Sequence, residues 1–320
     1  ENSVEIFSEI ESTPNYALLD VDEIEVAIDA LVLPLRVAAT YQLGNSYRNV
    51  GRSLLDRARS LEDEGDGKQG QMRRQESLTA FDDARRYYRS LVNDEARAPG
   101  RVRVMSQYQM VRASYQTEDY EGVVTETAEL LSRFPGSEYE DAALYDRGWA
   151  FYHMARYNEA ISSFEDLLAV SDDALKRDRS MFQMGESYIL LGKNDEARAE
   201  YGHLVEQYDF TELSNRELLQ MKAQRLRGLV KETTRELVAK AQIRIADSYA
   251  SEGRVSEAID AYSKVPTNYP QETLIVQKSY DNMATMVLEQ QGVDPGVRIL
   301  RQAIEQVDDT YFRGRAQLRI

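Results

Sequence analysis

Residues 144–168 read LYDRGWAFYHMARYNEAISSFEDLL, and this short segment carries the pattern on which the architecture depends. Its second half places Phe164 four residues after Ala160. The same spacing returns at Ala197 with Tyr201 and at Ala258 with Tyr262, and a weaker version begins at Val123. Thirty-seven residues separate Val123 from Ala160, and Ala160 from Ala197. A period of this length predicts stacked pairs of helices.

Each predicted pair carries one apolar stripe on each of its two helices. In residues 144–168 the stripes are Leu144, Gly148 and Phe151 in the first helix, and Ala160, Phe164 and Leu167 in the second. Glycine inside a helix costs about 1 kcal/mol relative to alanine. We therefore expect that Gly148 faces the small Ala160 and lets the two backbones approach closely, with Gly185 in the same place one period later.

The spacing resembles the tetratricopeptide repeat, whose pattern is W-x2-L-G-x2-Y, then A-x3-F, then P. The matching residues are Met181-x2-Met184-Gly185-x2-Tyr188, then Ala197-x3-Tyr201, with Pro135 and Pro270 at the closing position of two units. The resemblance implies an all-α, right-handed α-solenoid of tetratricopeptide-like helix pairs, here with two helical insertions. It also implies a concave groove, lined by the first helices, that binds partners.

The period and its interruptions predict the organisation of the chain. Residues 1–34 are expected to form an irregular lead-in and a helix that ends near Pro34. A charged loop at 62–70 should separate two long helices in the first unit, at about 37–62 and 71–93. Within a solenoid at 35–320 we expect units at about 37–93, 104–136, 141–172, 178–209, 239–270 and 278–309, an insertion at 210–238, and the start of a further unit at 311–320.

Two short phrases add a narrower resemblance. They are Phe134-Pro135-Gly136-Ser137 and Asn268-Tyr269-Pro270. They resemble bacterial cell-envelope members of the family, such as outer-membrane assembly lipoproteins and the coordinator of the Tol–Pal system. This resemblance implies a periplasmic protein, with the cysteine for a lipid anchor lying outside this sequence. A cytoplasmic, co-chaperone-like adaptor is the alternative, although no cluster of lysine and arginine stands ready to clamp a terminal carboxylate.

Composition excludes several classes of function. The formal net charge is −16, which argues against nucleic acid or an anionic membrane surface as a partner. No apolar run approaches the 18 residues of a membrane-spanning helix. The sequence contains no cysteine, so disulfides, thiol catalysis and cysteine-ligated metals are excluded.

Enzyme motifs are also missing. The two histidines, His153 and His203, stand in no catalytic or metal-binding motif. The acidic loop that begins at Glu62 fails as a calcium site, because Arg73 occupies the position that needs a bidentate glutamate. We therefore predict no catalytic, cofactor-binding or metal-binding residue. The repeats could still be the recruiting arm of an enzyme whose catalytic domain lies outside this chain.

The 37-residue period predicts an aromatic partner-binding groove on the first helices. Its three rows are Tyr108, Tyr145 and Phe182; Arg112, Trp149 and Glu186; and Tyr115, Tyr152 and Ile189, with His153 beside them. Aromatic residues and arginine dominate binding hot spots, and such a surface suits an extended peptide or a helix. We expect protein or peptide partners within a larger complex. The alternative is that these side chains only pack between neighbouring helices.

Overall fold

The computed structural model describes residues 35–208 and 234–320. In these two ranges the chain forms 13 helices and no strand, so the fold is all-α, as the period predicts. The predicted lead-in at 1–34 and most of the predicted insertion at 210–238 lie outside the described residues. No described helix is both long enough and apolar enough to cross a membrane.

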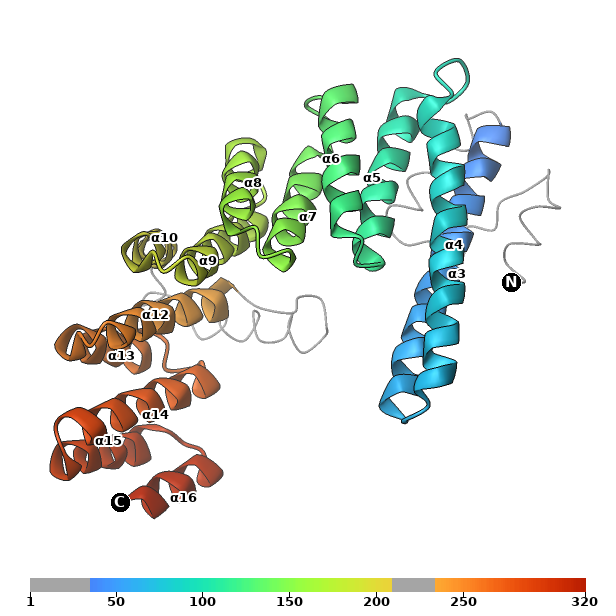
Figure 1. Cartoon of the computed structure of the whole chain (residues 1–320). Helices are drawn as coiled ribbons and strands as arrows, with labels where there is room; N and C mark the ends of the chain where they lie inside the picture. Colours follow the sequence, from blue (N-terminus) through green and yellow to red (C-terminus); the bar gives the residue numbers. More distant parts are fainter. Residues whose placement is uncertain (1–34, 209–233) are drawn as a thin grey trace. The chain divides into compact units, whose positions relative to one another are not determined.

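The chain divides into two compact units, Glu1–Val170 and Ser171–Ile320. The first unit begins with two long antiparallel helices that form a hairpin (Figure 1). Two shorter hairpins follow them. The helices of this unit are α3 (Leu35–Asp63), α4 (Gly67–Asn93), α5 (Gly100–Gln116), α6 (Tyr120–Arg133), α7 (Glu140–His153) and α8 (Tyr157–Val170).

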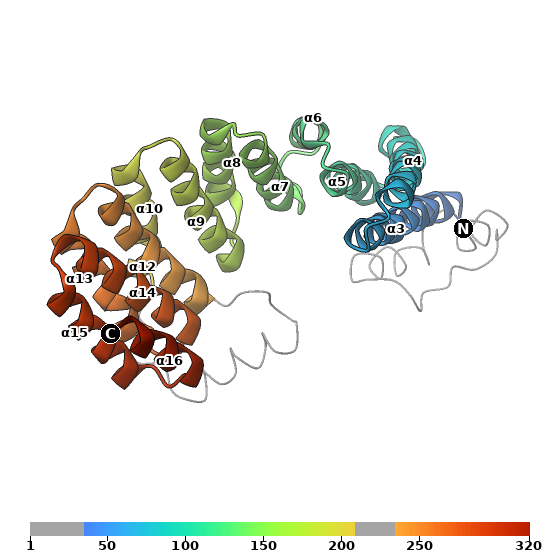
Figure 2. The ribbon, with the colours of Figure 1, turned by 60° about the horizontal axis from the view of Figure 1, so that its bottom comes forward.

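The second unit continues the pattern of short hairpins and ends in a single helix. Its helices are α9 (Ala174–Leu190), α10 (Asn194–Glu206), α12 (Thr234–Ser251), α13 (Val255–Asn268), α14 (Thr273–Gln290), α15 (Val293–Gln306) and α16 (Thr310–Arg319). Figure 2 shows the first helices α9, α12 and α14 in one layer and the second helices α10, α13 and α15 in another. Because α12 contacts both α9 and α14, the first helices of this unit form a continuous row.

The packing inside each hairpin includes a contact that the sequence analysis did not predict. A side chain placed on Gly148 would meet the ring of Phe164, with the nearest ring atom at 2.5 Å. At Gly185 it would meet the ring of Tyr201 at the same distance. The glycine therefore makes room for the aromatic ring of the second helix, while the predicted approach of Gly148 to Ala160 stays a prediction. Phe164 and Tyr201 are fully buried as a result.

Candidate partner-binding surface

Helix α7 separates a core face from an aromatic face. Its core face includes Leu144 and Gly148, which are buried. Tyr145, Trp149 and Tyr152 follow one another at i, i+4 and i+7, so they share the other face of the helix. All three side chains are only partly buried. The first helices α5 and α7 contact each other within the first unit.

Five rings from three helices meet at the ends of α5 and α7, and we call them the aromatic cluster: Tyr115, Tyr120, Trp149, Tyr152 and His153. The imidazole of His153 is the centre of the group. Its ring stacks on Tyr120, with centroids 4.9 Å apart and an interplanar angle of 13°. The centroids of Trp149, Tyr152 and Tyr115 lie 5.9, 6.2 and 6.4 Å from that of His153. His153 itself is exposed.

Buried core residues pack against the aromatic cluster. The indole of Trp149 lies with its edge against the buried ring of Phe164, at a centroid distance of 6.5 Å and an angle of 87°. Tyr115 and Tyr120 pack on a small apolar group that includes Val111 and Val123. Edge-to-face aromatic pairs contribute about 0.5–1.5 kcal/mol beyond area burial, so the rings are held in place without a ligand.

A buried carboxylate holds two other residues of the predicted groove. The side chain of Asp146 is 5% exposed and lies 3.0 Å from the guanidinium of Arg112. The hydroxyl of Tyr108 also donates to Asp146, at 3.4 Å, and the Tyr108 ring stacks on Tyr139. Burial alone would lower the pKa of Arg112, but the Asp146 charge beside it raises that pKa overall. Arg112 and Tyr108 therefore take part in packing between α5 and α7.

The hydroxyl of Tyr115 lies in the same environment. Burial, reinforced by the charge of Asp146, raises the pKa of Tyr115 to about 12. A raised pKa means that the neutral phenol is favoured. At neutral pH the Tyr115 side chain therefore presents an uncharged ring to the aromatic cluster.

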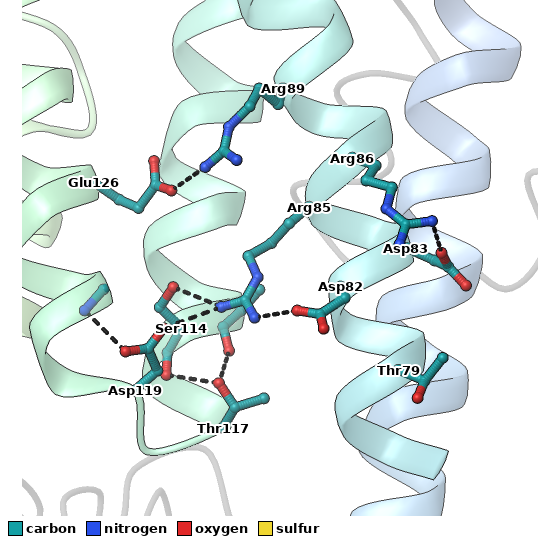
Figure 3. Close-up of polar contacts among 12 residues, drawn as sticks. Thr79, Asp82, Asp83, Arg85, Arg86, Arg89, Ser114, Thr117, Asp119 and Glu126 are labelled. Carbon is teal, nitrogen blue, oxygen red and sulfur yellow. Dashed lines mark hydrogen bonds and ion pairs between the residues drawn. The ribbon is translucent and has the colours of Figure 1, made fainter. Parts of the chain in front are cut away.

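Polar contacts fix the corner between α5 and α6, where Ser114 and Asp119 lie (Figure 3). Arg85 of α4 donates to the hydroxyl of Ser114 at 3.0 Å and reaches the carboxylate of Asp119 at 3.4 Å. Asp119 in turn caps α6 by accepting from the backbone N–H of Gly122 at 3.0 Å. Because Tyr120 directly follows this cap, the ring that stacks on His153 starts from an anchored backbone.

The predicted rows end in the second unit, with Phe182, Glu186 and Ile189 of α9. The Phe182 ring contacts Tyr201 at a centroid distance of 5.4 Å. Glu186 accepts from the Tyr201 hydroxyl at 2.5 Å and forms an ion pair with Arg244 at 2.7 Å. The charge of Glu186 is thus already paired within its own unit.

Sequence reasoning missed three residues of this region. Tyr120 and Tyr157 lie one period apart at the starts of two second helices, and Tyr157 contacts Tyr152 at 5.6 Å. Applying the period to the second helices as well as to the first would have found both. Asp146 is different, because only its burial next to Arg112 distinguishes it from the many exposed carboxylates of the chain.

The described residues offer no metal site. Within 35–208 and 234–320, no group of three histidine, cysteine, aspartate or glutamate side chains could hold an ion. The groups that make up the candidate surface are aromatic rings, hydroxyls and paired charges.

Three segments of the chain match the sequence profile of the tetratricopeptide repeat family, at residues 142–171, 179–211 and 240–272. The matched segments contain the hairpins α7–α8, α9–α10 and α12–α13, so the helix pairs at these positions resemble tetratricopeptide repeats. Proteins of this family are generally non-catalytic. No curated protein matches the chain in sequence.

Three solved structures with similar folds are remote in sequence. The apo form of RapI is 10% identical, with 86% of this chain and 80% of that chain covered and a TM-score of 0.50. The apo form of the quorum sensor NprR from B. thuringiensis is 12% identical, with coverage of 99% and 79% and a TM-score of 0.48. YrrB, described as a protein of this family with an unusual peptide-binding site, is 14% identical, with coverage of 67% and 92% and a TM-score of 0.42. The likeness to RapI shows the fold alone.

Proposed function

We propose that this protein is a non-catalytic scaffold that binds peptide segments or subunits of a larger assembly on the aromatic face of α5 and α7. One observation carries the proposal. The only tryptophan of the chain lies outside the core stripe of its helix, partly exposed, within a group of four other rings. A tetratricopeptide hairpin does not need these rings for its own core, because Phe164 and Gly148 already fill that role.

The chemistry of the rings suits a protein partner. Tyrosine and tryptophan supply a large contact area and lose little conformational entropy, since each has only two side-chain torsions. Hot spots of binding are enriched in tryptophan and tyrosine, and truncating a hot-spot residue costs about 2 kcal/mol or more of binding free energy. The neighbouring rings already hold Trp149 in place, which lowers the entropic cost of binding further.

The proposal includes a location in the bacterial cell envelope. The two phrases around Pro135 and Pro270 support it, through their resemblance to envelope members of the family. Absence of cysteine suits an oxidising compartment. Cell fractionation with an antibody against the protein tests the location, and recovery in the cytoplasm would instead favour the adaptor alternative.

A double variant tests the binding surface. The chain, immobilised and incubated with an envelope extract of its own organism, should capture specific partners that mass spectrometry identifies. Trp149→Ala with Tyr152→Ala should reduce this capture at least tenfold while the helical circular dichroism stays unchanged. The matched control is Tyr311→Ala with Leu318→Ala, which removes two side chains of α16 that are 79% and 90% exposed. Equal capture by both double variants would refute the surface.

A further inference from the structure

The repeats that carry the aromatic cluster have a large excess of negative charge. Residues 100–170, which form α5 to α8 and the loops between them, contain twelve carboxylates, six arginines and no lysine. The six arginines all form ion pairs within the described residues. The pairs are Arg101 with Glu138, Arg103 and Arg133 with Glu95, Arg112 with Asp146, Arg147 with Asp166, and Arg156 with both Glu121 and Glu159. The positive charges of these repeats are therefore already paired with carboxylates.

The negative potential extends to the cluster itself. Glu118 lies in the corner before α6, and its charge adds to the effect of burial in raising the pKa of Tyr120. The buried carboxylate of Asp146 acts on Tyr115 in the same direction. In addition, α5 and α7 end next to the rings, at Gln116 and His153, and the C-terminus of a helix carries partial negative charge.

Rings in a negative environment bind cations well, because the face of an aromatic ring is itself the negative part of its quadrupole. This chain already uses that contact elsewhere. The guanidinium of Arg156 lies 4.6 Å from the ring centre of Phe151, and those of Arg198 and Arg254 lie 4.5 Å from that of Tyr249. Among the described residues, no lysine or arginine lies over the rings of Trp149 or Tyr115.

His153 shows that the cluster accommodates a planar nitrogen-containing group. Its imidazole lies parallel to Tyr120 within the contact distance of stacked rings and meets Trp149 at an angle of 31°. A guanidinium is planar as well and stacks on aromatic faces in the same manner. Arginine therefore fits the geometry of the cluster better than the compact, strongly hydrated ammonium of lysine does.

We infer that the aromatic cluster receives arginine side chains from a basic, extended segment of a partner protein. Trp149 and Tyr120 provide the ring faces, and Glu118 and the helix C-termini provide the attraction. The inference rests on the proposed function, since it names the chemistry of the partner for the same surface. The negative charge of these repeats argues against a partner segment that is recognised through acidic side chains or through its C-terminal carboxylate.

Three short peptides test the inference. They are acetylated, amidated and labelled forms of Gly-Arg-Gly-Arg-Gly-Arg-Gly, the same sequence with citrulline for arginine, and the same with glutamate. Citrulline keeps the planar shape and hydrogen bonding of arginine but has no charge. By fluorescence anisotropy, the arginine peptide should bind at least tenfold more tightly than the citrulline peptide, and the glutamate peptide should not bind. Equal binding of the arginine and citrulline peptides would overturn the inference.

Variants separate the cluster from general charge attraction. Trp149→Leu should weaken binding of the arginine peptide at least tenfold, and Glu118→Gln should weaken it two- to threefold. The control Tyr311→Leu should leave it unchanged, because that residue lies on α16 of the second unit. Unchanged binding by both Trp149→Leu and Tyr120→Leu would mean that net charge alone attracts the peptide, and would overturn the inference. Circular dichroism confirms that each variant folds.

The outcome is distinguishable from failure of the proposed function. If the Trp149→Ala, Tyr152→Ala double variant loses its natural partners while the arginine peptide does not bind, the partner chemistry is wrong and the binding surface stands. If the double variant keeps all its partners, both proposals fail.

Discussion

Two kinds of hairpin differ in how the first helix accommodates a buried aromatic side chain of the second helix. One kind is α7–α8 of the first unit, and the other is α9–α10 and α12–α13 of the second unit. In each, a buried aromatic side chain of the second helix approaches the residue fifteen positions earlier in the first helix. In the first unit that pair is Phe164 with Trp149. In the second unit the pairs are Tyr201 with Glu186 and Tyr262 with Asp247, and each tyrosine hydroxyl donates to the carboxylate at 2.5 Å.

One hydroxyl group accounts for the difference. A buried tyrosine needs an acceptor for its O–H, and a carboxylate in the first helix supplies it. That carboxylate is then used by further groups of its own unit, by Arg244 at Glu186 and by Asn282 at Asp247. A buried phenylalanine makes no such demand. The position in α7 can therefore carry Trp149, whose contacts are rings rather than hydrogen bonds.

The largest expected effect comes from removing the shared aromatic ring. Phe164→Ala should destabilise the protein by about 3–5 kcal/mol, because it deletes a fully buried ring and leaves a cavity beside Gly148. Urea denaturation followed by circular dichroism measures the loss. Tyr311→Ala, at an exposed ring of α16, should change the free energy of unfolding by less than about 0.5 kcal/mol. A small loss for Phe164→Ala would contradict the assigned packing.

Exchanging phenylalanine and tyrosine between the two kinds of hairpin should cost less stability than deleting the ring. It also tests the pairing with the residue fifteen positions earlier. Tyr201→Phe removes a hydrogen bond to a charged group and should cost about 1.5–3 kcal/mol. Phe164→Tyr places a hydroxyl next to Trp149, which has no acceptor, and should cost about 1–3 kcal/mol. Adding Trp149→Glu to Phe164→Tyr should restore at least part of that loss. If the second substitution only adds to the damage, the matched pairing is not what distinguishes the hairpins.

The glycine that makes room for the ring gives the next effect. Gly148→Ala and Gly185→Ala should each destabilise by about 1–3 kcal/mol, because the new methyl group overlaps the ring of Phe164 or Tyr201. Gly202 is the matched control, since it is also helical and its added methyl group would have no atom within 4 Å. Gly202→Ala should be neutral or stabilising by up to about 1 kcal/mol. Equal behaviour of the three variants in urea denaturation would remove the argument for close packing at Gly148 and Gly185.

The smallest effect is the contribution of Tyr262 to the loss of stability at alkaline pH. Burial, together with the Asp247 charge, raises the pKa of Tyr262 above its ordinary value of 10.0. Above about pH 10 the unfolded chain therefore loses this proton while the folded chain keeps it, so stability falls as pH rises. Tyr262→Phe should lose less stability than the parent protein between pH 9.5 and 10.5, by under about 1 kcal/mol. If urea denaturation shows that both proteins lose the same free energy of unfolding between the two pH values, the environment described for Tyr262 is contradicted.

Much of the fold could be predicted because it depends on a period. Spacing along the sequence is enough to place Phe164, Tyr201 and Tyr262 in second helices and to pair each with a first helix. The contact of Gly148 with the ring of Phe164 could not be derived in this way. It depends on the axial offset of two packed helices, which the period leaves undetermined.

For the candidate surface, too, the period predicts some contacts and leaves others undetermined. The period brings Tyr115, Trp149 and Tyr152 to one face, and the rings of all three meet that of His153. It could not show that Glu186 is paired, because its partner Arg244 lies 58 residues further along the chain, beyond the segment that interrupts the repeats. The extension of the aromatic rows to Phe182 and Glu186 stays a prediction.

The fluorescence of Trp149 tests the central claim most directly, because it is the only tryptophan in the chain and its emission reports on the aromatic cluster alone. A purified partner, titrated into the protein, should shift or quench this emission with a midpoint equal to the dissociation constant measured independently by calorimetry. Binding that calorimetry detects but that leaves the Trp149 emission unchanged would place the partner elsewhere and contradict the account.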